Sequence, residues 1–114
     1  MSKNIVQKVR GMRDILPEEQ KYFKVLRSSF ESACEHSGFE RIYTPTVEST
    51  NLFIRTVGKG TDIVDKEMYT FKDKSNNSVT LRPEGTASIA RAYLEGGMTS
   101  RPQPVKLYYE MPMF

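Results

Sequence analysis

Proline and glycine divide this chain into short segments, and this division constrains its fold more than any other feature of the sequence. Pro17 presets the backbone angle of a helix start, and Gly38 ends the helical pattern that follows. Pro45 and Pro83 lack the backbone donor that a strand interior needs, so each marks the end of a strand. We therefore expect helices and strands that begin and end at these residues.

The spacing of apolar residues indicates which segments are helices and which are strands. Between residues 17 and 37 they recur at three- and four-residue steps, which predicts an amphipathic helix. Similar patterns, with turn residues at 73–78, predict a strand at 39–44, a brief helix at 52–57, strands at 68–72 and 79–82 joined as a hairpin, a helix at 84–95 and a strand at 105–113. The order lacks the strand-helix-strand rhythm of a parallel sheet. We predict one α+β domain over residues 1–114, with an antiparallel sheet backed by helices.

Composition leaves the type of partner open. The chain has a formal net charge of +3 and a pI near 9.0, which would suit a phosphate-rich partner, but its basic and acidic residues are interspersed. A solvated mixed-charge surface explains these values equally well. Cys34 is the one cysteine, and the sequence shows neither an apolar signal segment nor a membrane span, so a cytoplasmic protein without membrane contact is expected.

Two candidate chemical motifs fail on their residue types. The segment 58–61 holds the Gly-Lys-Gly-Thr of a phosphate loop, but Phe53 stands where such a loop needs its leading glycine. Cys34 and His36 are the only thiol and imidazole, and they do not make a set of three or four metal ligands. We therefore expect neither a metal site nor thiol catalysis within these 114 residues.

The segment LRPEGT at 81–86 joins a predicted strand to a predicted helix and places three notable residues at the junction. Glu84 supplies a carboxylate, Gly85 removes a side chain and Thr86 adds a hydroxyl. Such a corner can hold a small polar ligand. Alternatively, Glu84 is a first-turn residue that favours the helix dipole and Thr86 is a surface hydroxyl.

Five segments, in order, resemble the histidyl-tRNA synthetase family of class II aminoacyl-tRNA synthetases. They are RGMRD at 10–14 with Leu16 and Pro17, Thr44 and Pro45 with Glu48, KEMYTF at 66–71, LRPEGT at 81–86 and YEMPMF at 109–114. The resemblance implies a partial class II core belonging to a histidine–tRNA ligase. The parent enzyme would activate histidine with ATP and magnesium and then charge histidine tRNA.

The resemblance also assigns roles to individual residues. Glu84 is implied to face the α-ammonium group of histidine, with Gly85 leaving room and Thr86 adding a hydroxyl. A carboxylate suits that task because charge-assisted hydrogen bonds are about twice as strong as neutral ones. The region that resembles the family's homodimer interface includes Phe39, Ile42, Tyr43 and Pro45. Alternatively, these are ordinary core residues of a single domain.

The resemblance stops at Phe114, where the family's second motif continues with an arginine that binds the substrate carboxylate and the ATP α-phosphate. We therefore expect residues 1–114 to be an N-terminal fragment of the catalytic domain, inactive alone and without tight binding of ATP or magnesium. The nearest alternative is the regulatory paralogue that partners ATP phosphoribosyltransferase, which tends to carry Asp-Met-Thr in place of Glu84, Gly85 and Thr86. Prolyl or threonyl enzymes, and a non-catalytic dimerising fragment, are further alternatives.

Overall fold

The computed structural model describes residues 5–57 and 67–114, and the chain divides into two compact units. Unit 1 is Met1–Gly38 and unit 2 is Phe39–Phe114. The prediction of a single domain over residues 1–114 stays a prediction. The segment 58–61, considered above as a phosphate loop, lies outside the described residues.

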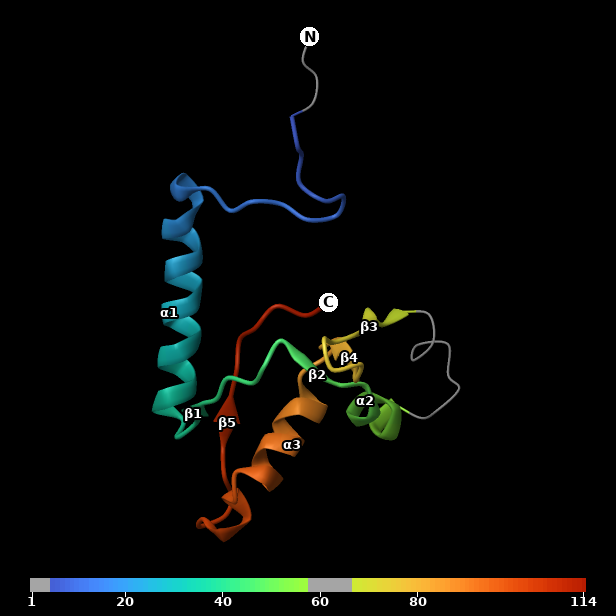
Figure 1. Ribbon diagram of the computed structural model, residues 1–114. Helices are drawn as coiled ribbons and strands as arrows, with labels where there is room; N and C mark the ends of the chain where they lie inside the picture. Colours follow the sequence, from blue (N-terminus) through green and yellow to red (C-terminus); the bar gives the residue numbers. More distant parts are fainter. Residues whose placement is uncertain (1–4, 58–66) are drawn as a thin grey trace. The chain divides into compact units, whose positions relative to one another are not determined.

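Unit 1 consists of an extended lead and one long helix. A short 3-10 helix, η1 (Pro17–Glu19), runs directly into α1 (Gln20–His36), which confirms the predicted helix at 17–37 (Figure 1). Gly38 has a φ of +85°, a left-handed conformation that glycine adopts without steric cost and that ends the helix. Ahead of the helix, both Nη atoms of Arg13 donate to the Glu19 carboxylate, at 3.1 and 3.2 Å.

Unit 2 is built on a three-stranded antiparallel sheet. Its strand order is β2 (Val47–Ser49), β4 (Ser78–Leu81) and β3 (Thr70–Lys72), with β4 in the centre (Figure 1). Glu48 pairs with Thr80 across one ladder and Thr70 pairs with Thr80 across the other. The helices α2 (Thr50–Val57) and α3 (Thr86–Glu95) pack against each other, and α2 also contacts β2 and β4. The α+β class with helices behind an antiparallel sheet is therefore confirmed.

The hairpin turn between β3 and β4 owes its shape to Asp73. Its Oδ1 accepts hydrogen bonds from the backbone N–H groups of Ser75 and Asn77, at 2.9 and 2.8 Å. These bonds, the one from Asn77 foremost, hold the pKa of Asp73 below its usual value. Asn76 takes a positive φ of 66°, which Asn tolerates better than most residues. The turn predicted from the polar cluster 73–78 is present.

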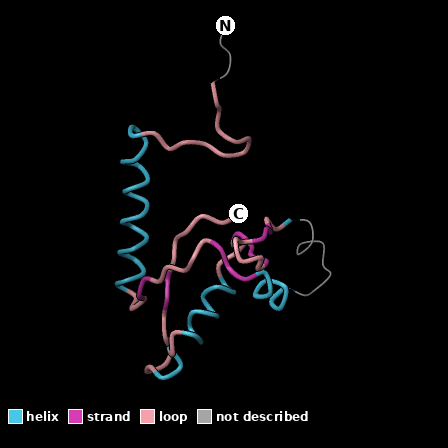
Figure 2. Tube along the Cα trace, viewed as in Figure 1, coloured by secondary structure: helices cyan, strands magenta, loops and turns pink. Residues whose placement is uncertain are grey.

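A second, two-stranded sheet departs from the prediction. β1 (Glu40–Arg41) pairs in parallel with β5 (Leu107–Tyr108), and loop backbone continues beyond each strand (Figure 2). The strands predicted at 39–44 and 105–113 are thus much shorter than expected. Pro45 and Pro112 lack ladder donors, and the backbone N–H of Phe114 instead donates to the carbonyl of Arg82.

The core of unit 2 mixes apolar and polar side chains. Phe53, Ala87, Tyr108 and Met111 are its buried hydrophobic residues among those described. Some buried hydroxyls are paired, since that of Thr80 lies 2.9 Å from those of both Thr50 and Thr70, whereas the buried Ser88 hydroxyl has no hydrogen-bond partner among the described residues. Hydroxyl groups that bond to one another therefore form part of the core of this unit.

The largest fully buried side chain is that of Arg82, which is 1% exposed. Its Nε donates to the carbonyl of Pro112 at 2.8 Å and its Nη1 to the carbonyl of Thr44 at 3.0 Å. The guanidinium also lies 5.7 Å from the centre of the Tyr43 ring. Two segments that are distant in sequence, one at residues 43–44 and one at Pro112, are therefore tied to the end of β4.

Replacing Arg82 by leucine should destabilise the chain, because the carbonyls of Thr44 and Pro112 would lose their donors inside the protein. The expected loss in free energy of unfolding is about 2–4 kcal/mol. Urea denaturation followed by tyrosine fluorescence measures it, with Arg101→Leu as the control because Arg101 is exposed. Equal urea midpoints for the two variants would show that the buried hydrogen bonds of Arg82 contribute nothing.

Candidate functional site

The site considered for ligand binding is the turn between β4 and α3. Arg82 anchors its start through the bonds described above, and its backbone N–H also donates to the carbonyl of Thr46 at 3.0 Å. Pro83 follows and cannot continue the ladder. The helix then begins at Thr86, as the pattern at 84–95 predicted to within two residues. The turn is thus held at both ends.

The carboxylate of Glu84 bridges the first turn of α3. Its Oε2 accepts from the backbone N–H of Thr86 at 2.6 Å, and its Oε1 accepts from that of Ala87 at 3.0 Å. The first four N–H groups of a helix have no partner within the helix, so these bonds satisfy two of them. The negative charge is also favourable at the positive end of the helix dipole. The alternative interpretation made Glu84 a first-turn residue; instead it lies two residues ahead of Thr86, from where its carboxylate caps α3.

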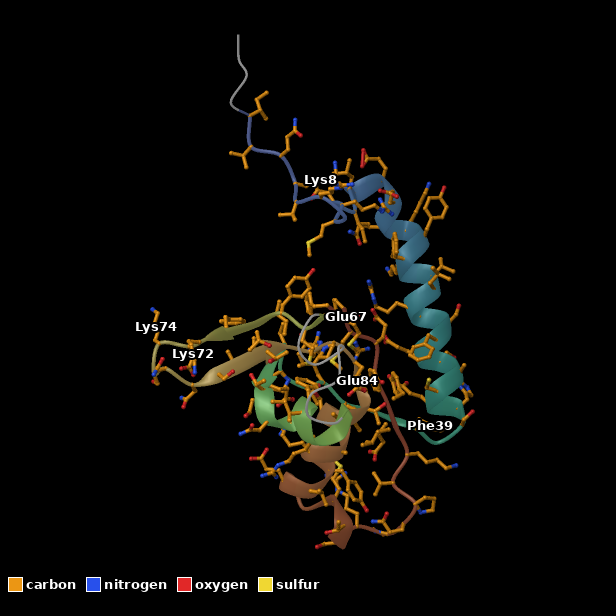
Figure 3. The ribbon with its side chains drawn as sticks, turned by 90° about the vertical axis from the view of Figure 1, so that its right-hand side faces the viewer. Lys8, Phe39, Glu67, Lys72, Lys74 and Glu84 are labelled. Carbon is orange, nitrogen blue, oxygen red and sulfur yellow. The ribbon has the colours of Figure 1, made fainter. Side chains whose placement is uncertain are left out.

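Capping does not use up the Glu84 carboxylate. Each of its oxygens has two lone pairs and is engaged by one N–H, so acceptor capacity remains on both. The residue is only partly buried, at the upper end of α3 in Figure 3, far from Lys72 and Lys74 at the hairpin tip. An approaching cationic donor would therefore meet a carboxylate whose orientation is already fixed.

Gly85 is buried beneath the ring of Tyr109. A Cβ atom added at Gly85 would lie 2.5 Å from the Cε2, Cζ and Oη atoms of that ring, closer than real Cβ contacts allow. Its φ of −100° and ψ of −25° are open to any residue. The absence of a side chain at position 85 therefore makes room for Tyr109, a neighbour that sequence reasoning did not identify.

Thr86 is exposed and borders two open grooves of unit 2. The first, of about 450 Å³, is mainly apolar and runs between α3 and the segment around β5; its other lining residues are Phe39, Ile89, Ala90, Tyr93, Val105, Lys106, Leu107 and Tyr109. The second, of about 630 Å³, lies along α3 on the side of Leu52 and Arg91. Glu84 lines neither groove, so the three candidate residues are adjacent but do not share one cavity.

An ion pair fixes α3 to the sheet behind this turn. Glu48, on β2, is 7% exposed, and its two carboxylate oxygens lie 2.9 and 3.0 Å from Nε and Nη2 of Arg91. Arg91 also reaches Glu95 one turn along the helix, at 2.6 Å. Hydrogen bonding to Glu48 is the main cause that raises the pKa of Arg91. The pattern of Arg91 and Glu95 is visible in the sequence, but the pairing with Glu48 is not.

The four residues assigned to an interface lie along the β1 segment. Phe39 is partly buried, with the Lys106 ammonium 5.6 Å from its ring centre, and the backbone N–H of Ile42 donates to the carbonyl of Tyr108. Tyr43 is 66% exposed and Pro45 is also exposed. Phe39 and Ile42 therefore have neighbours within unit 2. Tyr43 also has one, the Arg82 guanidinium, but like Pro45 it is exposed.

Residues 5–57 and 67–114 offer little for other kinds of site. Within those ranges no three His, Cys, Asp or Glu side chains are grouped so as to hold a metal ion. The part of the chain that is described also has no helix long and apolar enough to cross a membrane. In unit 1, Cys34 is a half-buried free thiol, and Nδ1 of His36 lies 2.7 Å from the carbonyl of Ser32.

Comparison of the sequence with known families and curated proteins gives consistent matches. A family model described as histidyl-tRNA synthetase matches residues 11–114. A histidine–tRNA ligase of Dehalococcoides mccartyi is 53% identical over 108 residues, and one of Listeria monocytogenes is 53% identical over 110 residues. These matches cover 95% and 96% of this chain but 26% of each relative.

Solved structures give the same match in three dimensions. The apo histidyl-tRNA synthetase of S. aureus superposes with a TM-score of 0.83 at 43% identity, over 96% of this chain and 26% of that one. A protein of Bacillus halodurans described as an ATP phosphoribosyltransferase regulatory subunit/histidyl-tRNA synthetase superposes with a TM-score of 0.77 at 31% identity, over 99% of this chain and 28% of that one.

Proposed function

The chain belongs to the histidyl-tRNA synthetase family, and from this premise we propose that it carries part of the histidine-binding site of a histidine–tRNA ligase. It spans 26% of the length of the curated relatives that it matches. The activity, substrates and partners of a whole ligase are therefore proposals for this chain. The fixed carboxylate of Glu84 at the start of α3 is the observation that supports them best.

The chemistry proposed for the turn is recognition of the α-ammonium group of histidine by Glu84. An ammonium group has three donors, and the carboxylate keeps free lone pairs while it caps α3. Because the two helix N–H bonds hold the carboxylate still, little side-chain entropy remains to be lost on binding. The exposed hydroxyl of Thr86 is proposed to accept or donate a further hydrogen bond to the same substrate. Gly85 contributes because its lack of a side chain lets the turn pack closely against the ring of Tyr109.

The reaction proposed for the whole ligase has two steps. The carboxylate of histidine attacks the α-phosphorus of ATP, which forms histidyl-adenylate and releases pyrophosphate; a terminal hydroxyl of histidine tRNA then accepts the histidyl group. Magnesium would neutralise phosphate charge when bound. We propose that this chain's own contribution is to bind and orient histidine through the turn at Glu84.

The regulatory paralogue of ATP phosphoribosyltransferase is less favoured. The curated relatives with 50–53% identity are described as histidine–tRNA ligases. The structure from Bacillus halodurans, whose description includes the regulatory subunit, is 31% identical. The glutamate at position 84 also favours a ligase, because the regulatory paralogue tends to have an aspartate there.

We predict that histidine perturbs the backbone amide signals of Gly85 and Thr86 in an NMR titration of the 114-residue chain. Histidinol, which keeps the ammonium but lacks the carboxylate, should perturb the same signals, whereas N-acetylhistidine should not, since it lacks the ammonium. The Glu84→Gln variant should bind histidine at least about tenfold more weakly, through loss of a charge-assisted bond. Glu95→Gln, at the other end of α3, is the matched control.

Two outcomes of that titration would count against the proposed site. Equal responses to histidine and N-acetylhistidine would exclude recognition of the ammonium group. Equal affinities of Glu84→Gln and Glu95→Gln would exclude Glu84 as the group that binds it. In either case the capping role of Glu84 would remain as the reason for a glutamate at this position.

The 114 residues alone are predicted not to form histidyl-adenylate. The positive groups that stabilise charge on the α-phosphate are proposed to lie in parts of the ligases that this match does not cover, and for the same reason ATP and magnesium should bind weakly. Histidine-dependent exchange of labelled pyrophosphate into ATP measures the activity. A rate above that of a reaction without protein would contradict the prediction.

We also propose a cytoplasmic homodimer that acts on histidine tRNA, in keeping with a role in protein synthesis. Exposed Tyr43 supports the dimer, so Tyr43→Glu should weaken association about tenfold or more, measured by light scattering over a concentration series. Tyr69→Glu is the matched control because Tyr69 is similarly exposed, at 64% against 66%. A wild-type chain that stays monomeric at high concentration would disprove the dimer.

A further inference from the structure

The ring of Tyr109 occupies the space beside Gly85 that a side chain would fill. The contact involves the outer edge of the ring, including its hydroxyl oxygen. Tyr109 comes directly after β5, where Tyr108 is 5% exposed and paired with Arg41, and two residues before buried Met111. The backbone that carries the ring is therefore fixed on both sides.

Backbone conformation does not explain the glycine at position 85. Its φ and ψ lie in the right-handed helical region, which any residue can adopt. A glycine there loses conformational entropy on folding without a compensating positive φ. The close approach of Tyr109 is what requires a residue without a side chain.

We infer that Tyr109 is a positioning residue: its ring packs on Gly85 and thereby keeps the Glu84 carboxylate against the first amides of α3. If the ring moved away, the turn on either side of Gly85 would gain freedom, and the Glu84 carboxylate would leave the N–H groups of Thr86 and Ala87 more often. The effect on the turn stands by itself. Its consequence for histidine rests on the function proposed above.

The hydroxyl of Tyr109 is not needed for this role. Its Oη makes no hydrogen bond with any described residue, so the ring acts by occupying space. The same ring lines the mainly apolar groove that Thr86 borders. A phenylalanine at position 109 should therefore position Glu84 as well as tyrosine does, whereas an alanine should not.

Hydrogen exchange of the Thr86 and Ala87 amides reports the position of Glu84 directly. Both amides lie in the first turn of α3, where a helix provides no acceptor, and the Glu84 carboxylate is their partner. In the 114-residue chain, Tyr109→Ala should make both amides exchange about five- to tenfold faster, the change expected from loss of a helix cap. Tyr109→Phe should exchange like the wild type.

A double-mutant cycle tests whether Tyr109 acts through Gly85. Gly85→Ala should also speed exchange, because the new methyl group displaces the ring. In Gly85→Ala/Tyr109→Ala the methyl occupies part of the vacated space, so exchange should return toward the wild-type rate. Tyr93→Ala is the control. Tyr93 lines the same groove from α3, but the atoms nearest to a Cβ at Gly85 all belong to Tyr109.

The possible results separate this inference from the proposed function. Unchanged Thr86 and Ala87 exchange in Tyr109→Ala, the same increase in Tyr93→Ala, or effects that simply multiply in the double variant would each overturn it. If Gly85→Ala does not fold, the comparison of Tyr109→Ala with Tyr109→Phe still decides. Failure of histidine to bind the wild-type chain would overturn the proposed function and leave the exchange result intact. If both hold, Tyr109→Ala should weaken histidine binding and Tyr109→Phe should not.

Discussion

The buried guanidinium of Arg82 determines where the turn toward α3 begins. Its side chain binds the carbonyls of Thr44 and Pro112, and its own backbone pairs with Thr46 and Phe114. Arginine suits this position because its donors point in several fixed directions at once. With so few buried apolar side chains in unit 2, these bonds replace much of the packing that a larger core would supply. The bonds of Arg82 therefore also fix the position of the turn that follows.

Local patterns in the sequence were sufficient for the helices and the hairpin. The apolar repeat ahead of Gly38, and the polar cluster ahead of β4, each act within a few residues, so their outcome is visible without knowledge of the rest of the chain. The parallel pairing of β1 with β5 joins residues more than sixty positions apart, and no local pattern encodes it. β2 was missed for a different reason: its inward residue is Glu48, whose burial depends on Arg91.

At the candidate site, too, the features set by neighbouring residues could be predicted, whereas the contacts with distant segments could not. Glu84, Gly85 and Thr86 were identified from their residue types at a strand-to-helix junction and from a family resemblance. Their surroundings were not, because Tyr109 reaches Gly85 from another segment. The glycine was expected to leave room for a substrate, but it borders a protein ring. A glycine in a sequence can indicate that another group comes close to the backbone, but it does not identify that group.

Capping and substrate binding make compatible demands on Glu84. If histidine had to displace the helix amides from the carboxylate, binding would leave Thr86 and Ala87 N–H groups unpaired, at a cost of about 1–3 kcal/mol for each group kept from water. An ammonium group that uses the remaining lone pairs avoids this cost. The glutamate side chain is long enough to reach the amides of the residues two and three positions later in the chain while its outer lone pairs stay open. The capping geometry therefore supports the proposed recognition instead of competing with it.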